Sequence, residues 1–483
     1  DAGTFNLGGA WHNAQRNRLP AVVFAGRSPY ATAADIPGHR DAPIHWQQEQ
    51  LDQQALARAF GKWAMEVPRG RDLGPIVRRA FQVAQADPRG PAYVMLPREA
   101  LMEPGGAGLA RRLPPPRRAA PDPSGLADMA RCLADAAHPV IITSRTGSRV
   151  GAVTSLVTVA ELLGAPVLDQ RDRVSFPSRH PLYAGDAVEI LTGADVVLIL
   201  DCEVPWIPAH AAPPPSATVL QIDTDPVKAT MPLWTYPVDL ALTADTEVAL
   251  PLLADELRGL AGPSRAARWA DRREQVAGRL AEIRQQWDAF ASSAEPAAAP
   301  HAMMQALNKV LPPRAIVLEE AVTSRSALIR QIDRDPGSFF DTGSPALGWA
   351  VGGAMGVKLA RPEAPVFAVC GDGAFNFGVP TAAIWSAQRA GAPFIAVILN
   401  NSSYRASRLP VQRLYPGGAG AAEGSFPETD LSPAPDYVGL ACAYGGGGRV
   451  VHDSAELPDA VEYCLALEAE QRCAVLDIQL PVA

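Results

Sequence analysis

Residues 366–404 read VFAVCGDGAFNFGVPTAAIWSAQRAGAPFIAVILNNSSY, and this stretch indicates how the chain folds. Two apolar runs, Val366–Val369 and Phe394–Leu399, flank a segment with the apolar positions of a helix. Short, continuous apolar runs rich in β-branched residues are typical of parallel strands that helices cover on both faces. The stretch therefore predicts a strand, a helix and a second strand within a parallel α/β sheet.

Similar apolar runs occur along the rest of the chain, at residues 21–25, 92–96, 139–142, 196–200, 218–222, 315–318 and 473–478. The proline-rich stretch 104–123 cannot hold a helix or a central strand, so it predicts a domain boundary. A helical pattern over 265–290 gives way to alanine-rich sequence near 295, which predicts a second boundary. At roughly 150 residues per domain, the length also favours about three domains. We predict an α/β protein with three Rossmann-like parallel-sheet domains, residues 1–105, 122–290 and 300–483.

The composition argues against two classes of partner. Lys and Arg total 43 against 51 Asp and Glu, which gives a net charge of −8. A chain with this balance offers no basic field for nucleic acid or anionic lipid. No apolar run approaches the roughly 18 residues of a membrane span, and the N-terminal residues do not resemble a secretory signal. We expect a cytoplasmic protein that acts on a small molecule and binds neither nucleic acid nor membrane.

Polar motifs follow both strands of the opening stretch. Asp372 lies between two glycines after the first strand, and Asn401 follows the second strand, 29 positions later. Consecutive parallel strands deliver their carboxyl ends to one edge of a sheet, so the two side chains can meet there. A carboxylate, an amide oxygen and a backbone carbonyl such as that of Ser403 suit Mg²⁺, which also takes ligands from phosphates. Each motif alone is also a common turn pair, but their combination at consecutive strand ends favours a Mg-diphosphate site.

These motifs resemble the signature of the thiamine diphosphate (ThDP) enzymes of the acetolactate synthase, pyruvate decarboxylase and benzoylformate decarboxylase superfamily. Residues 383–387 and 176–181 are most similar to the benzoylformate decarboxylase branch, and residues 44–48, 62–63 and 88–93 resemble a pyrimidine-binding domain. The resemblance implies pyrimidine-binding, central and diphosphate-binding domains in that order. It also implies a homodimer or homotetramer, because the family holds ThDP between two chains.

The resemblance assigns the diphosphate and metal contacts residue by residue. Asp372, Asn401 and the Ser403 carbonyl would ligate Mg²⁺, and the amides of Gly373 and Ala374 would contact the diphosphate. Val322 and Thr323 match further diphosphate contacts. The preceding Glu319 and Glu320 are open to a second interpretation, as a solvated strand end.

The remaining assignments concern the thiazolium, the pyrimidine and the substrate. Leu347 matches the apolar residue that props ThDP into its bent form, although a core leucine is the alternative. Pro345 keeps a backbone carbonyl for the aminopyrimidine. Tyr404 and Arg405 would flank cofactor and substrate. Arg405 would pair with a substrate carboxylate, or else be a surface arginine.

The family glutamate that activates the aminopyrimidine would lie before Asp1. We therefore expect either a fragment of a complete enzyme, which the abrupt start favours, or a chain that binds ThDP without forming its carbanion efficiently. The predicted activity is ThDP- and Mg-dependent decarboxylation or carboligation of a 2-oxo acid, as a lyase or transferase. The alternatives are a non-catalytic or regulatory ThDP-fold protein and, with less support, a nicotinamide-dependent oxidoreductase, since no GxGxxG motif follows a predicted strand. The sequence after the strand at 196–200 differs from that of FAD-binding relatives, so no FAD is expected.

Overall fold

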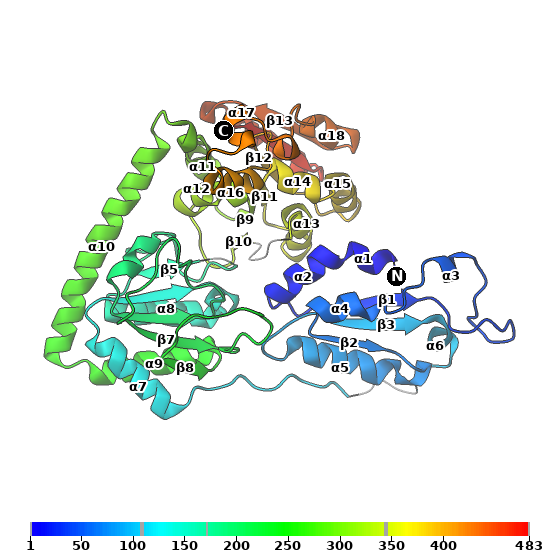
Figure 1. Ribbon diagram of the computed structural model, residues 1–483, viewed down its shortest axis with the longest axis horizontal. Helices are drawn as coiled ribbons and strands as arrows, with labels where there is room; N and C mark the ends of the chain where they lie inside the picture. Colours follow the sequence, from blue (N-terminus) through cyan, green and yellow to red (C-terminus); the bar gives the residue numbers. More distant parts are fainter. Residues whose placement is uncertain (1, 107–110, 171, 342–345, 482–483) are drawn as a thin grey trace. The chain divides into compact units, whose positions relative to one another are not determined.

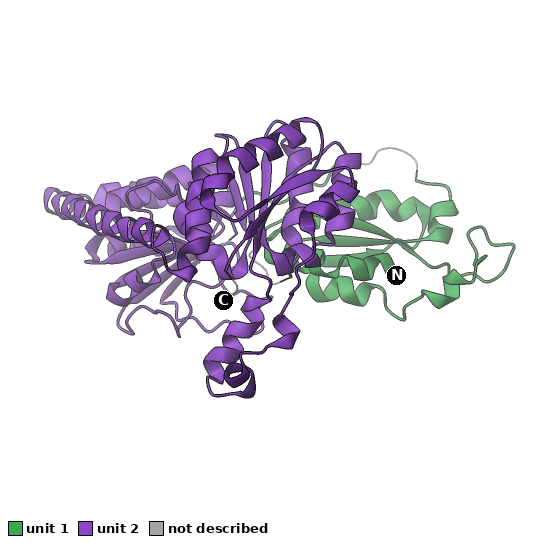
Figure 2. Ribbon diagram, turned by 90° about the horizontal axis from the view of Figure 1, so that it is seen from above, with its two compact units in different colours: residues 1–118, 343–346 green, residues 119–342, 347–483 purple. Residues whose placement is uncertain are grey.

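The computed structural model describes residues 2–106, 111–170, 172–341 and 346–481. The chain forms two compact units, residues 1–118 with 343–346 and residues 119–342 with 347–483 (Figure 2). Each of the three predicted domain ranges contains one parallel sheet, and the second and third sheets both belong to the larger unit. The predicted α/β class is confirmed, whereas the boundaries of three domains stay a prediction.

The smaller unit contains a three-stranded parallel sheet in the order β1-β3-β2. Its strands are β1 (Val22–Arg27), β2 (Trp63–Glu66) and β3 (Ala92–Pro97). Strand β3 is buried, whereas β1, an edge strand of this sheet, is only half-buried. The expectation that this strand is buried on both faces was therefore wrong. The accompanying helices are α1 (Ala2–Asn6), α2 (Gly8–Arg16), α3 (Ile44–Gln47), α4 (Gln54–Phe60), α5 (Leu73–Gln85) and α6 (Arg98–Met102).

The first sheet of the larger unit has five parallel strands in the order β5-β4-β6-β7-β8. They are β4 (Pro139–Thr143), β5 (Val167–Asp169), β6 (Val196–Leu200), β7 (Thr218–Asp223) and β8 (Leu240–Thr243). Helices of this region are α7 (Pro123–Asp135), α8 (Val150–Leu163), α9 (Thr246–Leu260) and the long α10 (Pro263–Ala291). Figure 1 shows α10 running along both sheets of this unit, and it confirms the helix predicted over 265–290.

The second sheet of the larger unit has six parallel strands in the order β10-β9-β11-β12-β14-β13. They are β9 (Ile316–Glu320), β10 (Phe339–Asp341), β11 (Val366–Gly371), β12 (Ile395–Asn400), β13 (Gly447–Val451) and β14 (Ala474–Gln479). The helices are α11 (Ala299–Val310), α12 (Arg325–Gln331), α13 (Trp349–Ala360), α14 (Asp372–Phe377), α15 (Pro380–Arg389), α16 (Arg405–Leu414), α17 (Ala419–Glu423), α18 (Tyr437–Ala443) and α19 (Leu457–Ala469).

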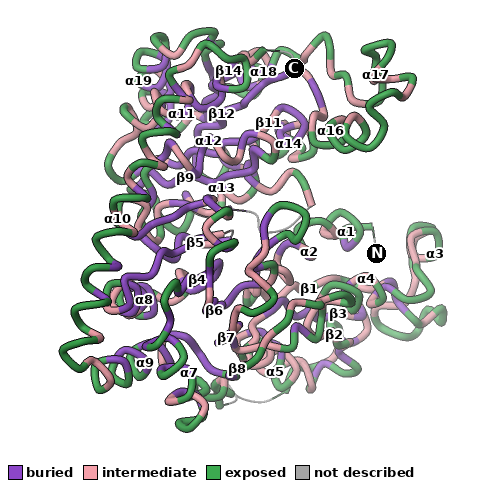
Figure 3. Tube along the Cα trace, turned by 60° about the vertical axis from the view of Figure 1, so that its left-hand side comes forward, coloured by how far each residue is buried: buried purple, intermediate pink, exposed green. Residues whose placement is uncertain are grey.

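Alternate residues of a central strand pack into separate cores on the two faces of this sheet. In β11, Phe367 and Val369 belong to the core that contains α11, α12 and α19. Val366, Ala368 and Cys370 belong to the core that contains α13, α15 and α18. The side-chain period of two thus explains the continuous apolar run, and Figure 3 shows the strands as buried segments between more exposed helices. Among the described residues, no helix has both the length and the apolar character needed to cross a membrane.

Candidate active site

Three neighbouring strands of the six-stranded sheet end at the candidate site. Strand β11 pairs in parallel with β9 on one side and with β12 on the other, so their carboxyl ends lie at the same edge. Asp372 follows β11, Asn401 follows β12, and the short 3₁₀ turn Val322–Ser324 follows β9. The structure therefore brings together the residues that the sequence placed at one sheet edge.

The candidate metal ligands form a tight, buried group of oxygen atoms. The Ser403 amide donates to Asp372 Oδ2 at 3.1 Å and to Asn401 Oδ1 at 3.0 Å. All three residues are buried. Ser402 turns the chain with a φ of 52°, and the turn is held by Leu431, whose amide donates to the Ser402 carbonyl at 2.9 Å. The described residues contain no cluster of three His, Cys, Asp or Glu suited to a metal. The predicted donor set is of another kind, with the carboxylate of Asp372, the side-chain amide oxygen of Asn401 and the carbonyl of Ser403.

The residues present fit a bound Mg²⁺ and a diphosphate. Burial raises the pKa of Asp372, and the backbone amides that donate to its carboxylate offset this effect only in part. A nearby cation would stabilise the charged form of this carboxylate. The buried Ser403 Oγ has no hydrogen-bond partner among the described residues, so this hydroxyl is available to a ligand. Oxygen donors of this kind match the preference of Mg²⁺.

The structure has no room for a side chain at residue 373. A Cβ atom at Gly373 would lie 2.6 Å from Cδ1 and Cε1 of Tyr404, so the tyrosine ring packs directly against the glycine backbone. The Gly373 amide donates to Asp372 Oδ1 at 2.8 Å. Helix α14 begins at Asp372 and contains the buried Ala374.

The two glutamates at the end of β9 are buried, so the interpretation as a solvated strand end was wrong. Glu320 accepts hydrogen bonds from the amides of Gly348, Trp349 and Ala350 at 2.7, 3.1 and 2.8 Å. It thereby satisfies the first turn of α13, whose amides have no partner within the helix. Because these amides directly follow Leu347, Glu320 fixes the backbone at that residue.

Glu319 belongs to a second buried group that joins the two sheets of the larger unit. The Nε of Arg325 donates to Asp341 Oδ2 at 2.8 Å and lies 3.6 Å from Glu319 Oε2. Its Nη2 donates to the Gln170 carbonyl beyond β5. Burial, and then the charge of Asp341, raise the pKa of Glu319 to about 8, while Arg325 acts in the opposite direction.

The other predicted site residues lie closer to the surface. Leu347 is 37% exposed and Val322 is 47% exposed, while Thr323 is half-buried on the same turn. Leu347 is therefore not a core leucine. Tyr404 and Arg405 are half-buried where α16 begins. Pro345 lies outside the described residues.

Asp477 of β14 is a supporting residue that the sequence analysis did not identify. Its Oδ1 accepts from Asn400 Nδ2 at 3.1 Å, and Asn400 Oδ1 accepts from the Ser402 amide at 3.1 Å. Asp477 thus supports the loop that carries Asn401 and Ser403. An acidic residue in an otherwise apolar buried strand could have drawn attention to it.

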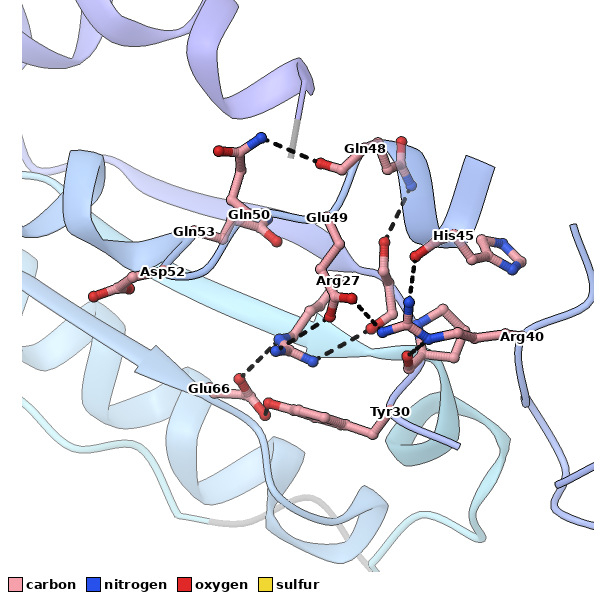
Figure 4. A network of polar contacts seen from close by, with 12 residues as sticks. Arg27, Tyr30, Arg40, His45, Gln48, Glu49, Gln50, Asp52, Gln53 and Glu66 are labelled. Atoms are coloured by element: carbon pink, nitrogen blue, oxygen red, sulfur yellow. Dashed lines mark hydrogen bonds and ion pairs between the residues drawn. The ribbon is translucent and has the colours of Figure 1, made fainter. Parts of the chain in front are cut away.

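The smaller unit has its own polar network at the end of β1 (Figure 4). Arg27 lies 3.6 Å from carboxylate oxygens of both Glu49 and Glu66 and stacks on Tyr30. Arg40 pairs with Glu49 and donates to the His45 carbonyl. Because arginines and glutamates neutralise one another, this network is explained by anchoring of the loop between β1 and α4.

Comparison with known proteins identifies the family. Residues 126–253 match the central domain of the thiamine pyrophosphate enzymes, and residues 322–478 match their C-terminal TPP-binding domain. The chain belongs to this family of ThDP-dependent enzymes.

Relatives extend the similarity to nearly the whole chain. Benzoylformate decarboxylase of Pseudomonas aeruginosa is 26% identical over 97% of this chain and 84% of its own length. Sulfoacetaldehyde acetyltransferase of Rhodobacter capsulatus is 28% identical over 89% of this chain and 75% of its own. The crystal structure of a thiamin diphosphate-dependent enzyme from Mycobacterium smegmatis superposes with a TM-score of 0.76 at 26% identity, covering 100% of this chain and 86% of that one.

Proposed function

We propose that this chain takes part in Mg²⁺- and ThDP-dependent decarboxylation or carboligation of a 2-oxo acid. The observation that carries the proposal is the buried group formed by Asp372, Asn401 and Ser403 where β11 and β12 end. Family membership supports ThDP as the cofactor and weighs against a nicotinamide-dependent reaction.

Each predicted residue has a distinct task in this scheme. Asp372, Asn401 and the Ser403 carbonyl would hold Mg²⁺, and the Gly373 backbone would approach the diphosphate. Bound ThDP supplies an electron sink for the carbanion left when a carboxylate departs as CO₂. Leu347, whose backbone is fixed through Glu320, would support the bound cofactor.

Arg405 would orient the substrate. Arg405 directly follows Tyr404, which packs on Gly373, so the backbone of Arg405 lies near the proposed diphosphate site. Arginine matches the two oxygens of a carboxylate in a bidentate way. This role favours a substrate that carries a carboxylate next to its keto group. The relatives include a decarboxylase and an acetyltransferase. Decarboxylation and carboligation would differ in what accepts the carbon fragment after CO₂ has left, a proton in the first case and a second carbonyl compound in the other.

A homodimer is part of the proposal. Large apolar side chains are exposed at Leu347 and, in the chain that follows Asp372, at Phe377, Val379 and Trp385. Such a group favours an interface, since isolated apolar patches on a surface are usually small. We propose that a second copy covers it, which light scattering of the purified chain would test; a monomer that binds ThDP fully would contradict it.

The first experiment is a titration with ThDP, with and without Mg²⁺, followed by near-UV circular dichroism. We expect saturable, Mg²⁺-dependent binding that Asp372→Ala abolishes and that Asp459→Ala, on the exposed side of α19, leaves intact. Turnover of benzoylformate or pyruvate would then separate an enzyme from the alternative, a ThDP-binding protein without activity. Mg²⁺-independent binding, or binding that survives in Asp372→Ala, would contradict the metal site.

A further inference from the structure

A separate cavity of about 330 Å³ lies within the larger unit, away from the strand ends described above. It is formed by α10, α11, α12 and the loop after β5, which all contribute polar side chains. Its volume is within the range of small-molecule sites. None of the residues assigned to ThDP or Mg²⁺ lines it.

Basic residues outnumber acidic residues in the lining of this cavity. Four basic residues line it, Arg179, Arg284, Lys309 and Arg330, against two acidic residues, Asp288 and Asp333. Two further carboxylates, Asp186 and Asp335, pair with Arg330 and Arg179 from outside the lining, so the group as a whole is electrically balanced. An anion would therefore be bound by particular cations and not by a net positive field.

Two of the four cations are already paired. Arg330 donates to both carboxylate oxygens of Asp186, at 3.0 and 3.2 Å. Arg179 lies 3.3 Å from Asp335 and 3.8 Å from Asp333. Their charges are thus compensated by the protein itself.

Arg284 and Lys309 are different, because neither forms an ion pair among the described residues. Arg284 donates one hydrogen bond, from Nη1 to the Tyr183 carbonyl at 3.2 Å, although a guanidinium has five donors. The guanidinium is half-buried, and burial lowers the pKa of Arg284 with no carboxylate to oppose the effect. Lys309 adds a second charge from α11 on the same cavity.

We propose that this cavity binds a small phosphoryl dianion, with Arg284 and Lys309 as its charged contacts. A phosphate or phosphomonoester carries close to two negative charges at neutral pH, one for each of the two cations in the lining that form no ion pair within the described part of the chain. Guanidinium groups bind phosphate oxygens through paired hydrogen bonds. Gln305 and Asn308 add amide groups to the lining, and Trp287 adds an aromatic wall for the body of an ester.

Calorimetric titration of the purified chain with sodium phosphate, without ThDP or Mg²⁺ and at constant ionic strength, tests the proposal. We expect saturable binding that weakens about tenfold in Arg284→Gln and in Lys309→Gln, since each loses a charge-assisted hydrogen bond. Arg279→Gln is the matched control, because Arg279 is exposed on the same helix and does not line the cavity. Asp288→Asn should bind several-fold more tightly, because it removes a negative charge from the lining.

A second titration, with glycerol 3-phosphate, distinguishes a phosphate ester from the free phosphate ion as the ligand. Tighter binding of the ester would identify a phosphorylated metabolite, and tighter binding of inorganic phosphate would identify the free ion; either supports the site. Absence of saturable binding of both, or equal binding by the Arg284→Gln, Lys309→Gln and Arg279→Gln variants, would overturn it. Circular dichroism would verify that each variant is folded. Since no cofactor is present, the result is independent of the proposed ThDP chemistry.

Discussion

The amide of Gly348 donates a 2.7 Å hydrogen bond to Oε1 of Glu320, a residue 28 positions earlier in the chain. Gly348 has a φ of 93°, and a Cβ atom there would lie 2.6 Å from the Phe377 carbonyl. The same carboxylate accepts from the next two amides of α13. Two features therefore restrict the backbone beside Leu347. One is the buried carboxylate of Glu320, and the other is the conformation of Gly348, which a residue with a side chain could not adopt without strain.

Replacing Glu320 with alanine should destabilise the larger unit. The change leaves three amides without their charged acceptor, and we expect a loss of about 1.5–3 kcal/mol in the free energy of unfolding. Urea unfolding followed by circular dichroism would measure it. Glu462→Ala is the control, because Glu462 is exposed on α19. Equal stability of the two variants would show that Glu320 contributes nothing to holding α13.

Glu319 predicts a pH dependence of stability. Its pKa, ordinarily 4.5, is raised to about 8 in the folded chain. The folded chain therefore keeps a proton that the unfolded chain releases between about pH 4.5 and 8, and the free energy of unfolding falls as the pH rises through this window. In Glu319→Gln this contribution is absent, so the variant should gain stability relative to the wild type at pH 8.5 more than at pH 5.

Urea titrations of both chains at the two pH values would measure this gain. The exposed Glu462→Gln serves as control, and its stability should follow the wild type at both pH values. Parallel pH profiles for Glu319→Gln and the wild type would show that Glu319 is ionised in both states.

Gly373→Ala should weaken ThDP binding through Tyr404. The new methyl group overlaps ring atoms at 2.6 Å, and overpacking of this kind costs about 1–3 kcal/mol. Adding Tyr404→Ala removes the overlap, so the double variant should bind more tightly than the sum of the two single effects predicts. Near-UV circular dichroism titrations of the four proteins form the cycle. Strict additivity would mean that the ring does not limit the space at residue 373.

Asp477→Ala should reduce the apparent affinity for Mg²⁺. Without its acceptor, Asn400 loses the contact that orients the Ser402 turn, and loss of such outer contacts typically weakens metal binding about 10–100-fold. The Mg²⁺ concentration at half-maximal ThDP binding measures the effect, with Asp459→Ala as control. If Asp477→Ala and the control needed the same Mg²⁺ concentration for half-maximal binding, Asp477 would have no role in supporting the loop that carries Asn401 and Ser403.

The sequence predicted central strands well and edge strands poorly. All nine predicted strands are present, whereas β2, β5, β8, β10 and β13 were missed. Each of these five lies at an edge of its sheet. An edge strand pairs on one side only and is often short, so it lacks the long apolar run that buried strands require. Strand β13, with the sequence GGRVV, illustrates how weak the signal becomes.

The candidate site shows a similar limit. Asp372 and Asn401 could be predicted because they directly follow strands of strong pattern, and strand order alone places them at one edge. The orienting roles of Glu320 and Asp477 could not be predicted, because their partners, Gly348 and Asn400, are distant in sequence and are selected by packing. Sequence motifs therefore identify groups at strand ends, whereas the groups that orient them depend on the folded sheet.

Helix α10 has a consequence for how the larger unit loses its structure. At 29 residues, α10 is about 44 Å long. Its Arg272 donates hydrogen bonds to the carbonyls of Leu163 and Ala136. Near the other end of the helix, the Trp287 carbonyl accepts a hydrogen bond from Gln331 of α12. The five-stranded and six-stranded sheets thus share one continuous helix, and unfolding of α10 would expose residues packed against it beside each sheet. We expect amide hydrogens of β6 and β11 to exchange through the same global opening, as in a single cooperative folding unit.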